Sequence, residues 1–225
     1  MASAEVFDTE AARLCEILLE REMVSPLLNL GSSTREFRHV TKPHIEARLF
    51  GPLALAGVTV VHSDLKAAEG VDISGDILDP AVLSRLRAAG FKSVLISNLL
   101  EHVRDRPAVI AACEVIVGSG GLILATVPSS FPFHADPIDT YYRPTPDALA
   151  RAFTGSEILL SEELIGRTYA EQIEAAGSTF WRELALTVCW SLIFFLRPKS
   201  AASRLHRWRW YKRSYRVSIA LVAVR

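Results

Sequence analysis

Apolar residues along this chain form two kinds of pattern, short continuous runs and longer stretches with helical spacing. The short runs end at Gly, Pro, Ser or Asp, which is typical of buried strands in a parallel sheet. They predict strands at residues 27–30, 58–62, 70–76, 93–97, 121–127, 157–164 and 217–224. The helical spacing predicts helices at residues 8–23, 43–56, 80–89, 107–117 and 145–153. Strands that alternate with helices predict an α/β fold with a doubly wound, seven-stranded, mostly parallel sheet.

The last two predicted strands are separated by many more residues than a minimal α/β domain needs. We therefore expect residues 1–225 to form a single domain, with residues 166–216 as a helical insertion before the last strand. All four tryptophans lie in this insertion, together with an uncharged run at residues 184–196. That run is shorter than the roughly 20 residues that span a bilayer, so it predicts a buried or interfacial helix.

Composition narrows the class of protein. Half of the 225 residues are apolar and 22% are charged, which excludes collagen, a disordered polyelectrolyte and a disulfide scaffold. The three cysteines lie far apart and form no CxxC motif, so we expect a reduced compartment and no metal site. The first residues are acidic and lack an apolar core, which predicts no signal peptide and a cytoplasmic location.

Charge is distributed unevenly although the formal net charge is zero. No acidic residue follows Glu183, whereas nine of the 25 basic residues do. Tryptophan, an apolar run and adjoining Arg and Lys predict that residues 181–216 lie on an anionic membrane surface. Three alternatives remain open for this segment: a lid over a substrate site, a homodimer contact, and nucleic-acid binding, the last being the least favoured.

Candidate chemistry gathers where the predicted strands end. Gly31 follows the first strand, Asp64 the second, Asp76 the third, and residues 98–102 the fourth. Ligands of open parallel sheets bind beyond the carboxyl ends of the strands. Two carboxylates and a glycine turn suit a nucleoside, because a carboxylate accepts hydrogen bonds from ribose hydroxyls or an adenine amino group. The alternative is that both aspartates are solvated caps or turn residues.

These strand ends resemble the motifs of class I S-adenosylmethionine-dependent methyltransferases. Residues 27–33 (LLNLGSS) resemble the first motif of the family. Asp64, within residues 62–65 (HSDL), resembles the acidic residue at the end of the family's second strand. Residues 75–76 (GD) resemble the adenine-side acid, and residues 97–103 (SNLLEHV) the fourth-strand signature. Residues 120–124 (GGLIL) are similar to the following turn and strand.

The resemblance implies S-adenosylmethionine as the cofactor. It places the methionine part at the turn after Gly31, the ribose hydroxyls at Asp64, the adenine at Asp76, and the sulfonium beside Asn98. The cofactor-binding residues implied are Asn29, Gly31, Ser32, Ser33, Asp64, Asp76, Ile77, Asn98, Leu99 and His102.

The first motif departs from the family pattern, since Ser32, Ser33 and Thr34 stand where further glycines are usual. Because of this departure, one alternative stays open: the chain is a non-catalytic relative of these enzymes that serves as a binding or scaffold protein. A nicotinamide-dependent reductase is a weaker alternative, because the chain has no GxGxxG motif. Residues 34–46, rich in Arg, His and Lys, could form part of the wall of the site.

Methyl transfer to a hydroxyl or amine needs a base, for which His102 and His134 are the candidates. His134 lies in residues 131–144, the acceptor loop, which resembles the acceptor side of small-molecule and sugar methyltransferases. The substrate-binding residues predicted there are His134, Asp136, Asp139, Tyr141, Tyr142 and Arg143. The alternative is that Asp139 pairs with Arg143 and the aromatic rings pack. We therefore predict methyl transfer to a sugar, glycan, lipid-linked or other small-molecule acceptor.

Overall fold

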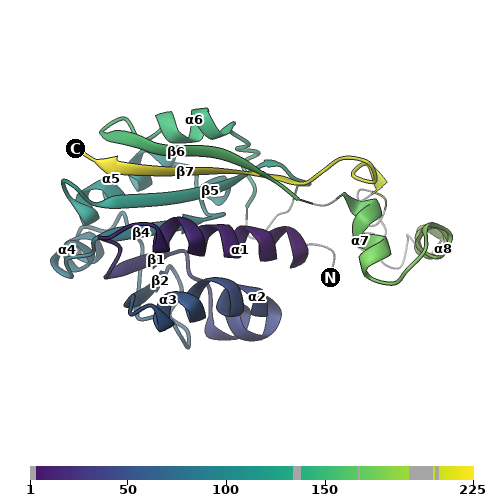
Figure 1. The fold of residues 1–225 in the computed structure, drawn as a ribbon, viewed down its shortest axis with the longest axis horizontal. Helices are drawn as coiled ribbons and strands as arrows, with labels where there is room; N and C mark the ends of the chain where they lie inside the picture. The colour runs from purple at the N-terminus through teal and green to yellow at the C-terminus, as the bar shows by residue number, and fades with distance from the viewer. Residues whose placement is uncertain (1–3, 134–137, 167, 193–204, 206–207) are drawn as a thin grey trace.

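The computed structural model describes residues 4–133, 138–166, 168–192, 205 and 208–225. Its centre is a seven-stranded sheet with the order β3-β2-β1-β4-β5-β7-β6 (Figure 1). The strands are β1 (Leu27–Leu30), β2 (Val60–Asp64), β3 (Ile73–Ser74), β4 (Ser93–Ser97), β5 (Leu122–Ser130), β6 (Ser156–Ile165) and β7 (Arg216–Val224). Neighbouring strands from β3 to β5 are parallel, and β7 is antiparallel to both β5 and β6. The prediction of a doubly wound, mostly parallel sheet is confirmed.

The helices begin at the caps that the sequence supplies. Asp79, Asp105 and Thr145 accept hydrogen bonds from backbone N–H groups of the helices that follow them, each of which has a proline in its first turn. The helical elements are α1 (Ala4–Leu19), η1 (Phe37–Thr41), α2 (Pro43–Ile45), η2 (Glu46–Phe50), α3 (Gly51–Leu55), α4 (Pro80–Ala88), η3 (Leu100–His102), α5 (Arg106–Val117), α6 (Pro146–Arg151), α7 (Tyr169–Ala175) and α8 (Phe180–Leu192).

Several predicted boundaries were wrong. The first helix ends at Leu19 rather than at residue 23, and Met23 is exposed. The helix predicted from residue 43 is preceded by the π-helical turn η1, so the helical segment begins earlier. The strand predicted at residues 70–76 shrinks to two residues, because Gly70 and Gly75 both adopt positive φ angles that interrupt the extended backbone.

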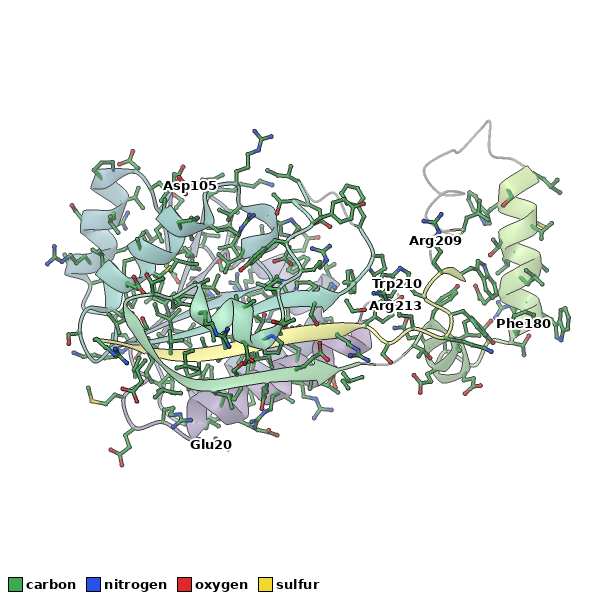
Figure 2. The ribbon with its side chains drawn as sticks, turned by 90° about the horizontal axis from the view of Figure 1, so that it is seen from above. Glu20, Asp105, Phe180, Arg209, Trp210 and Arg213 are labelled. Atoms are coloured by element: carbon green, nitrogen blue, oxygen red, sulfur yellow. The ribbon has the colours of Figure 1, made fainter. Side chains whose placement is uncertain are left out.

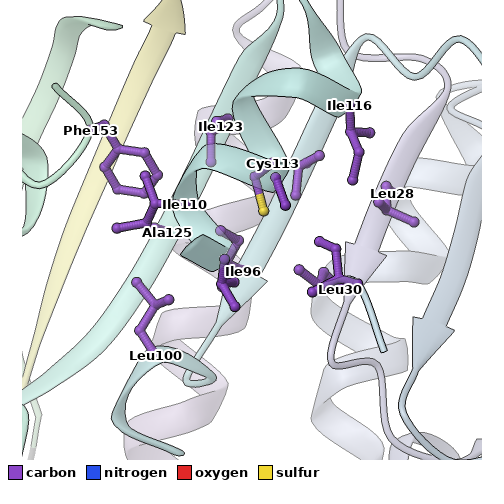
Figure 3. Close-up of a cluster of buried hydrophobic side chains, with 14 of the residues drawn as sticks. Leu28, Leu30, Ile96, Leu100, Ile110, Cys113, Ile116, Ile123, Ala125 and Phe153 are labelled. Carbon is purple, nitrogen blue, oxygen red and sulfur yellow. The ribbon is translucent and has the colours of Figure 1, made fainter. Parts of the chain in front are cut away.

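Both faces of the sheet are covered by helices. Side chains that alternate along β1, β4 and β5, such as Leu28 and Ile96, pack on one face against α4, α5 and α6. Ile110 of α5 and Phe153, just after α6, belong to the same cluster (Figure 3). The opposite face packs against α1 and the segment from η2 to α3. Burial on both faces explains why these strands read as continuous apolar runs, and it leaves their carboxyl ends as the edge at which polar residues gather.

Helices α7 and α8 lie between β6 and β7, within the predicted insertion (residues 166–216). They extend beyond the edge of the sheet, and α8 is the outermost element (Figures 1 and 2). Its packing in the insertion is aromatic: Phe180 and Tyr211 both contact Trp208. Among the described residues, no helix is long and apolar enough to cross a membrane.

Candidate active site

The ends of the first four strands meet at one edge of the sheet. Gly31 and Ser32 both donate a backbone hydrogen bond to the carbonyl of Ser63, at 2.8 and 3.0 Å, which joins the end of β1 to that of β2. A Cβ atom on Gly31, whose φ is +74°, would lie 3.0 Å from the Leu99 side chain just after β4. The positive φ and this close approach to the neighbouring strand end together favour glycine at this position.

The turn after β1 keeps a glycine-like shape without the usual further glycines. Ser33 has a φ of +54°, in the left-handed region that side chains rarely adopt. Its backbone N–H donates to Oδ2 of Asp64 at 2.8 Å, and the other Asp64 oxygen accepts from the backbone of Lys66. Asp64 therefore holds in place a turn in which a serine, not a glycine, adopts the left-handed conformation.

Arg38 completes this support, and the sequence did not single it out. Its side chain, in η1, is only 3% exposed. One guanidinium nitrogen donates to the carbonyls of Ser32 and Ser33 at 2.9 and 2.8 Å, and the other terminal nitrogen donates to Gly70 at 2.7 Å. Arg38 thus joins the turn to the loop before β3. The richness of residues 34–46 in basic side chains was the signal available for it.

The remaining predicted cofactor residues have different surroundings. Asp76 is exposed just after β3 and accepts a hydrogen bond from the backbone of Leu78, whereas Ile77 is buried in the core. Asn29 is buried in β1, where its amide lies 3.1 Å from Nδ1 of His62. Burial and the nearby Arg38 lower the pKa of His62 to about 4, so this ring is neutral.

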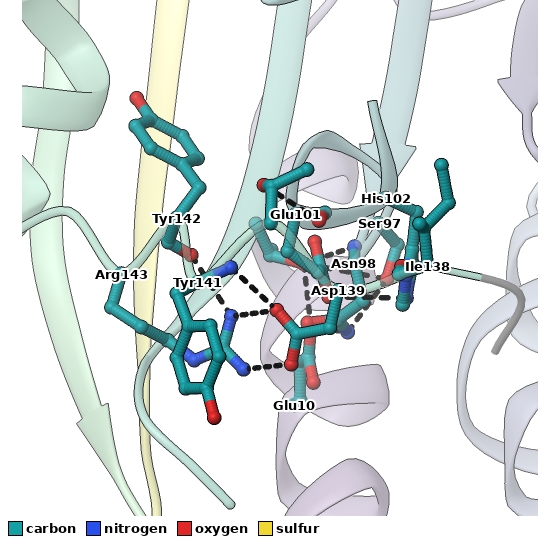
Figure 4. A network of polar contacts seen from close by, with 12 residues as sticks. Glu10, Ser97, Asn98, Glu101, His102, Ile138, Asp139, Tyr141, Tyr142 and Arg143 are labelled. Carbon is teal, nitrogen blue, oxygen red and sulfur yellow. Dashed lines mark hydrogen bonds and ion pairs between the residues drawn. The ribbon is translucent and has the colours of Figure 1, made fainter. Parts of the chain in front are cut away.

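Asn98 has the strained conformation that often marks a functional position. Its φ is +50°, and its amide nitrogen donates to Oε1 of Glu10 at 2.8 Å (Figure 4). The same Glu10 oxygen accepts from the Thr126 hydroxyl at 2.6 Å. Among the described residues, Oδ1 of Asn98 and Oε2 of Glu10 are buried without a hydrogen-bond partner. Burial raises the pKa of Glu10, which favours its protonated form. The Asn98 oxygen is then an unpaired acceptor at the end of β4, which suits a ligand that carries positive charge or donates hydrogen bonds.

Glu101 is fully buried beside this cluster. Burial raises the pKa of Glu101 to about 8, and neither carboxyl oxygen has a hydrogen-bond partner in the described part of the chain. The folded chain therefore keeps this carboxyl protonated at pH values where the unfolded chain, with an ordinary pKa of 4.5, has lost the proton. Stability falls over this window, because the folded state binds more protons than the unfolded state.

We expect Glu101→Gln to remove that pH dependence, since glutamine stays neutral. The melting temperatures of the two proteins should agree below about pH 4, and the variant should gain on the wild type as the pH rises toward 8. The gain approaches several kcal/mol at most, on the order of 1.4 kcal/mol for each unit of pKa shift. If the difference in melting temperature between the two proteins does not change across this pH range, Glu101 is ionised in the folded protein.

The acceptor loop (residues 131–144) is tied to the same strand end. The backbone N–H and the hydroxyl of Thr140 both donate to the carbonyl of Glu101 at 2.9 Å, and Nδ1 of His102 contacts the carbonyl of Ile138 (Figure 4). Asp139 and Arg143 form a bidentate ion pair with bonds of 3.1 and 2.5 Å. The loop is therefore fastened beside residues 98–102, where an acceptor would have to meet the cofactor.

The predicted substrate residues of this loop do not all share one environment. The ion pair between Asp139 and Arg143 agrees with the alternative to substrate binding, in which these two residues pair with each other. Tyr142 lies under the guanidinium of Arg106, whereas Tyr141 is exposed and stacks on Phe133. His134 and Asp136 lie outside the described residues, and their roles stay predictions.

Comparison with solved structures identifies the fold. A SAM-dependent methyltransferase from Archaeoglobus fulgidus matches over 96% of this chain and 93% of its own, with a TM-score of 0.53 and 14% identity. The chain has the class I methyltransferase fold. Coclaurine N-methyltransferase, solved with N-methylheliamine and S-adenosylhomocysteine (SAH), shares this fold over 96% of this chain and 70% of its own, with a TM-score of 0.51 and 12% identity.

The methyltransferase fold does not by itself decide the reaction. The [4+2]-cyclase SpnF matches over 95% of this chain and 80% of its own, with a TM-score of 0.50 and 15% identity. No protein-family model and no curated protein matches the sequence. Function must therefore be argued from the site on this methyltransferase fold.

Proposed function

We propose that this protein transfers a methyl group from S-adenosylmethionine to a small acceptor. The observation that carries the proposal is the convergence of Gly31, Asp64 and Asn98 at one edge of a methyltransferase-type sheet. The unpaired oxygen of Asn98 fits the cofactor, because an oxygen acceptor can face the positive charge of a sulfonium. The methyltransferase resemblance of the sequence motifs points to the same ligand.

The chain's own residues then have distinct tasks. The turn from Gly31 to Ser33 would hold the amino-acid part of the cofactor, Asp64 the ribose hydroxyls, and Asp76 with Ile77 the adenine. When bound, the cofactor supplies an electrophilic methyl group on sulfur. Because methyl transfer is an in-line displacement, Asn98 and the acceptor loop, which is fastened to Glu101 and His102, would contribute by aligning the acceptor and by excluding water.

The acceptor we propose is a hydroxyl or amine of a sugar, glycan, lipid-linked intermediate or other small molecule. What supports this class is the polar acceptor loop, which combines tyrosines, acidic residues and an arginine next to the end of β4. His102 is placed at this edge, beside the loop, and is the described candidate for the base; His134 is the other candidate.

A thermal melt with S-adenosylmethionine, SAH and NADH in parallel tests the proposal. A ligand at about 100 times its dissociation constant adds roughly 2.7 kcal/mol, or on the order of 5–10 °C for a chain of this size. We expect a shift with the two sulfur compounds and none with NADH. Incorporation of a labelled methyl group into an acceptor library then separates an active enzyme from a protein that only binds.

The other outcomes identify the alternatives. A shift with SAH but no methyl transfer to any acceptor favours a non-catalytic binding or scaffold protein. A shift with NADH alone would replace the proposal with a nicotinamide-dependent reductase.

A further inference from the structure

Glu10 connects the first helix of the chain to the end of β4. It lies on α1 and is only 2% exposed. Its Oε1 atom accepts hydrogen bonds from the amide nitrogen of Asn98 at 2.8 Å and from the Thr126 hydroxyl at 2.6 Å (Figure 4). The backbone N–H of Asn98 in turn donates to the Thr126 hydroxyl at 3.2 Å. The three residues therefore form a closed ring of hydrogen bonds, although Glu10 and Asn98 are 88 residues apart in the sequence.

This ring determines the direction of the Asn98 amide. Because Glu10 accepts from the amide nitrogen, the amide oxygen lies on the other branch of the planar group and points away from Glu10. That oxygen is buried and has no hydrogen-bond partner in the described part of the chain. The backbone of Asn98, with a φ of +50°, is also held by its bonds to Thr126. Without Glu10, the amide group is free to turn over and to exchange the positions of its oxygen and nitrogen.

The two ends of an amide interact with a sulfonium in opposite ways. The oxygen carries partial negative charge and attracts a cation, whereas the N–H group carries partial positive charge and repels it. S-adenosylmethionine has a positive charge on its sulfur, and the sulfur of SAH is neutral. An oxygen that is held toward the sulfur therefore stabilises bound S-adenosylmethionine more than bound SAH.

We propose that Glu10 is a positioning residue, which orients Asn98 so that its Oδ1 atom faces the sulfonium of the bound cofactor. The inference rests on the proposed function, in which Asn98 lies beside that sulfur. Glu10 acts through Asn98 and does not itself contact the cofactor. As a consequence, the site distinguishes the cofactor from SAH, the product that remains after the methyl group has left, and this limits inhibition by the product.

Isothermal titration of the full chain with S-adenosylmethionine and with SAH tests the proposal. The variant Glu10→Met keeps an unbranched side chain of similar length but has no oxygen to accept from Asn98. We expect it to weaken binding of S-adenosylmethionine roughly tenfold and binding of SAH less than about threefold, because only the former carries the charge that Oδ1 faces. The matched control is Glu10→Gln, whose oxygen still accepts from Asn98. Burial raises the pKa of Glu10, so the neutral glutamine resembles its protonated form, and both affinities should stay within about twofold of the wild type.

A double-mutant cycle shows whether Glu10 acts through Asn98. Asn98→Gly removes the amide and suits the φ of +50° at this position. The double variant Glu10→Met, Asn98→Gly should have the same ratio of the two affinities as Asn98→Gly alone, since no amide is left to orient. If Glu10→Met does not fold, Glu10→Asn takes its place, because its side chain is one methylene shorter than glutamine and draws the acceptor oxygen away from Asn98.

The possible results separate this inference from the proposed function. The role of Glu10 is overturned if Glu10→Met leaves both affinities unchanged or weakens both by the same factor, as a purely structural role would do. It is also overturned if Glu10→Gln loses as much affinity as Glu10→Met. A folded wild type that binds neither compound refutes the proposed function, and the inference with it, before any variant is compared.

Discussion

Replacing Asp64 by alanine should abolish detectable binding of S-adenosylmethionine and SAH. The variant would lack the carboxylate that we propose accepts the ribose hydroxyls, and the backbone N–H of Ser33 would lose its acceptor at 2.8 Å. Hydrogen bonds to a charged group contribute about 1.5–3 kcal/mol each, so losing two of them weakens binding roughly 100-fold or more. Isothermal titration with SAH measures this change directly.

Asp72→Ala is the matched control for this prediction. Asp72 also accepts a hydrogen bond from the backbone of β2, from His62 at 2.8 Å, but it has no proposed contact with the cofactor. Its loss should cost about 1 kcal/mol of stability and leave SAH affinity within about threefold of the wild type. If Asp64→Ala retains the affinity of the wild type, the assignment of the ribose site is wrong, whatever the fate of the fold.

Replacing Arg38 by methionine should destabilise the protein by about 3 kcal/mol, which is roughly 6–12 °C in melting temperature. Methionine keeps the volume of the side chain but removes every donor, so the carbonyls of Ser32, Ser33 and Gly70 lose their buried partner. Burial lowers the pKa of Arg38, but a guanidinium stays charged at neutral pH, so the lost hydrogen bonds are charge-assisted. Thermal melting without ligand gives this effect.

The comparison with Arg35→Met separates this role from a general loss of charge. Arg35 lies three residues earlier, exposed, and its ion pair with Glu69 at 3.4 Å is of the surface kind that contributes little. We expect its removal to change the melting temperature by no more than about 2 °C. Because Arg38 holds the turn that would bind the cofactor, Arg38→Met should also weaken SAH binding. Equal melting temperatures for the two variants would contradict the role given to Arg38.

Local patterns along the chain were enough to predict the sheet and the edge where the site lies. A strand buried on both faces must be a continuous apolar run, and it must end where Gly, Ser or Asp takes over, as at Gly31 and Asp64. Strand order could be expected only through the methyltransferase resemblance, since β7 enters the sheet between β5 and β6 from the far end of the chain.

The buried residues that support the site could not be predicted from local patterns along the chain. Glu10 and Thr126 are 116 residues apart in the sequence, yet they share a hydrogen bond of 2.6 Å. A glutamate on a helix predicted to be amphipathic has the same pattern whether it faces water or a strand end. The same holds for Arg38, whose partners Ser33 and Gly70 are backbone groups that any sequence carries.

The insertion shows most clearly which properties the sequence determines and which the tertiary structure decides. The sequence by itself determined that residues 184–196 are uncharged, that every tryptophan lies nearby, and that no acidic residue follows Glu183. Only the tertiary structure decided which side of α8 faces outward, because that depends on the bond between Thr187 and Trp208, 21 residues apart. Composition along a helix specifies how apolar it is, whereas contacts between distant residues specify where the apolar side points.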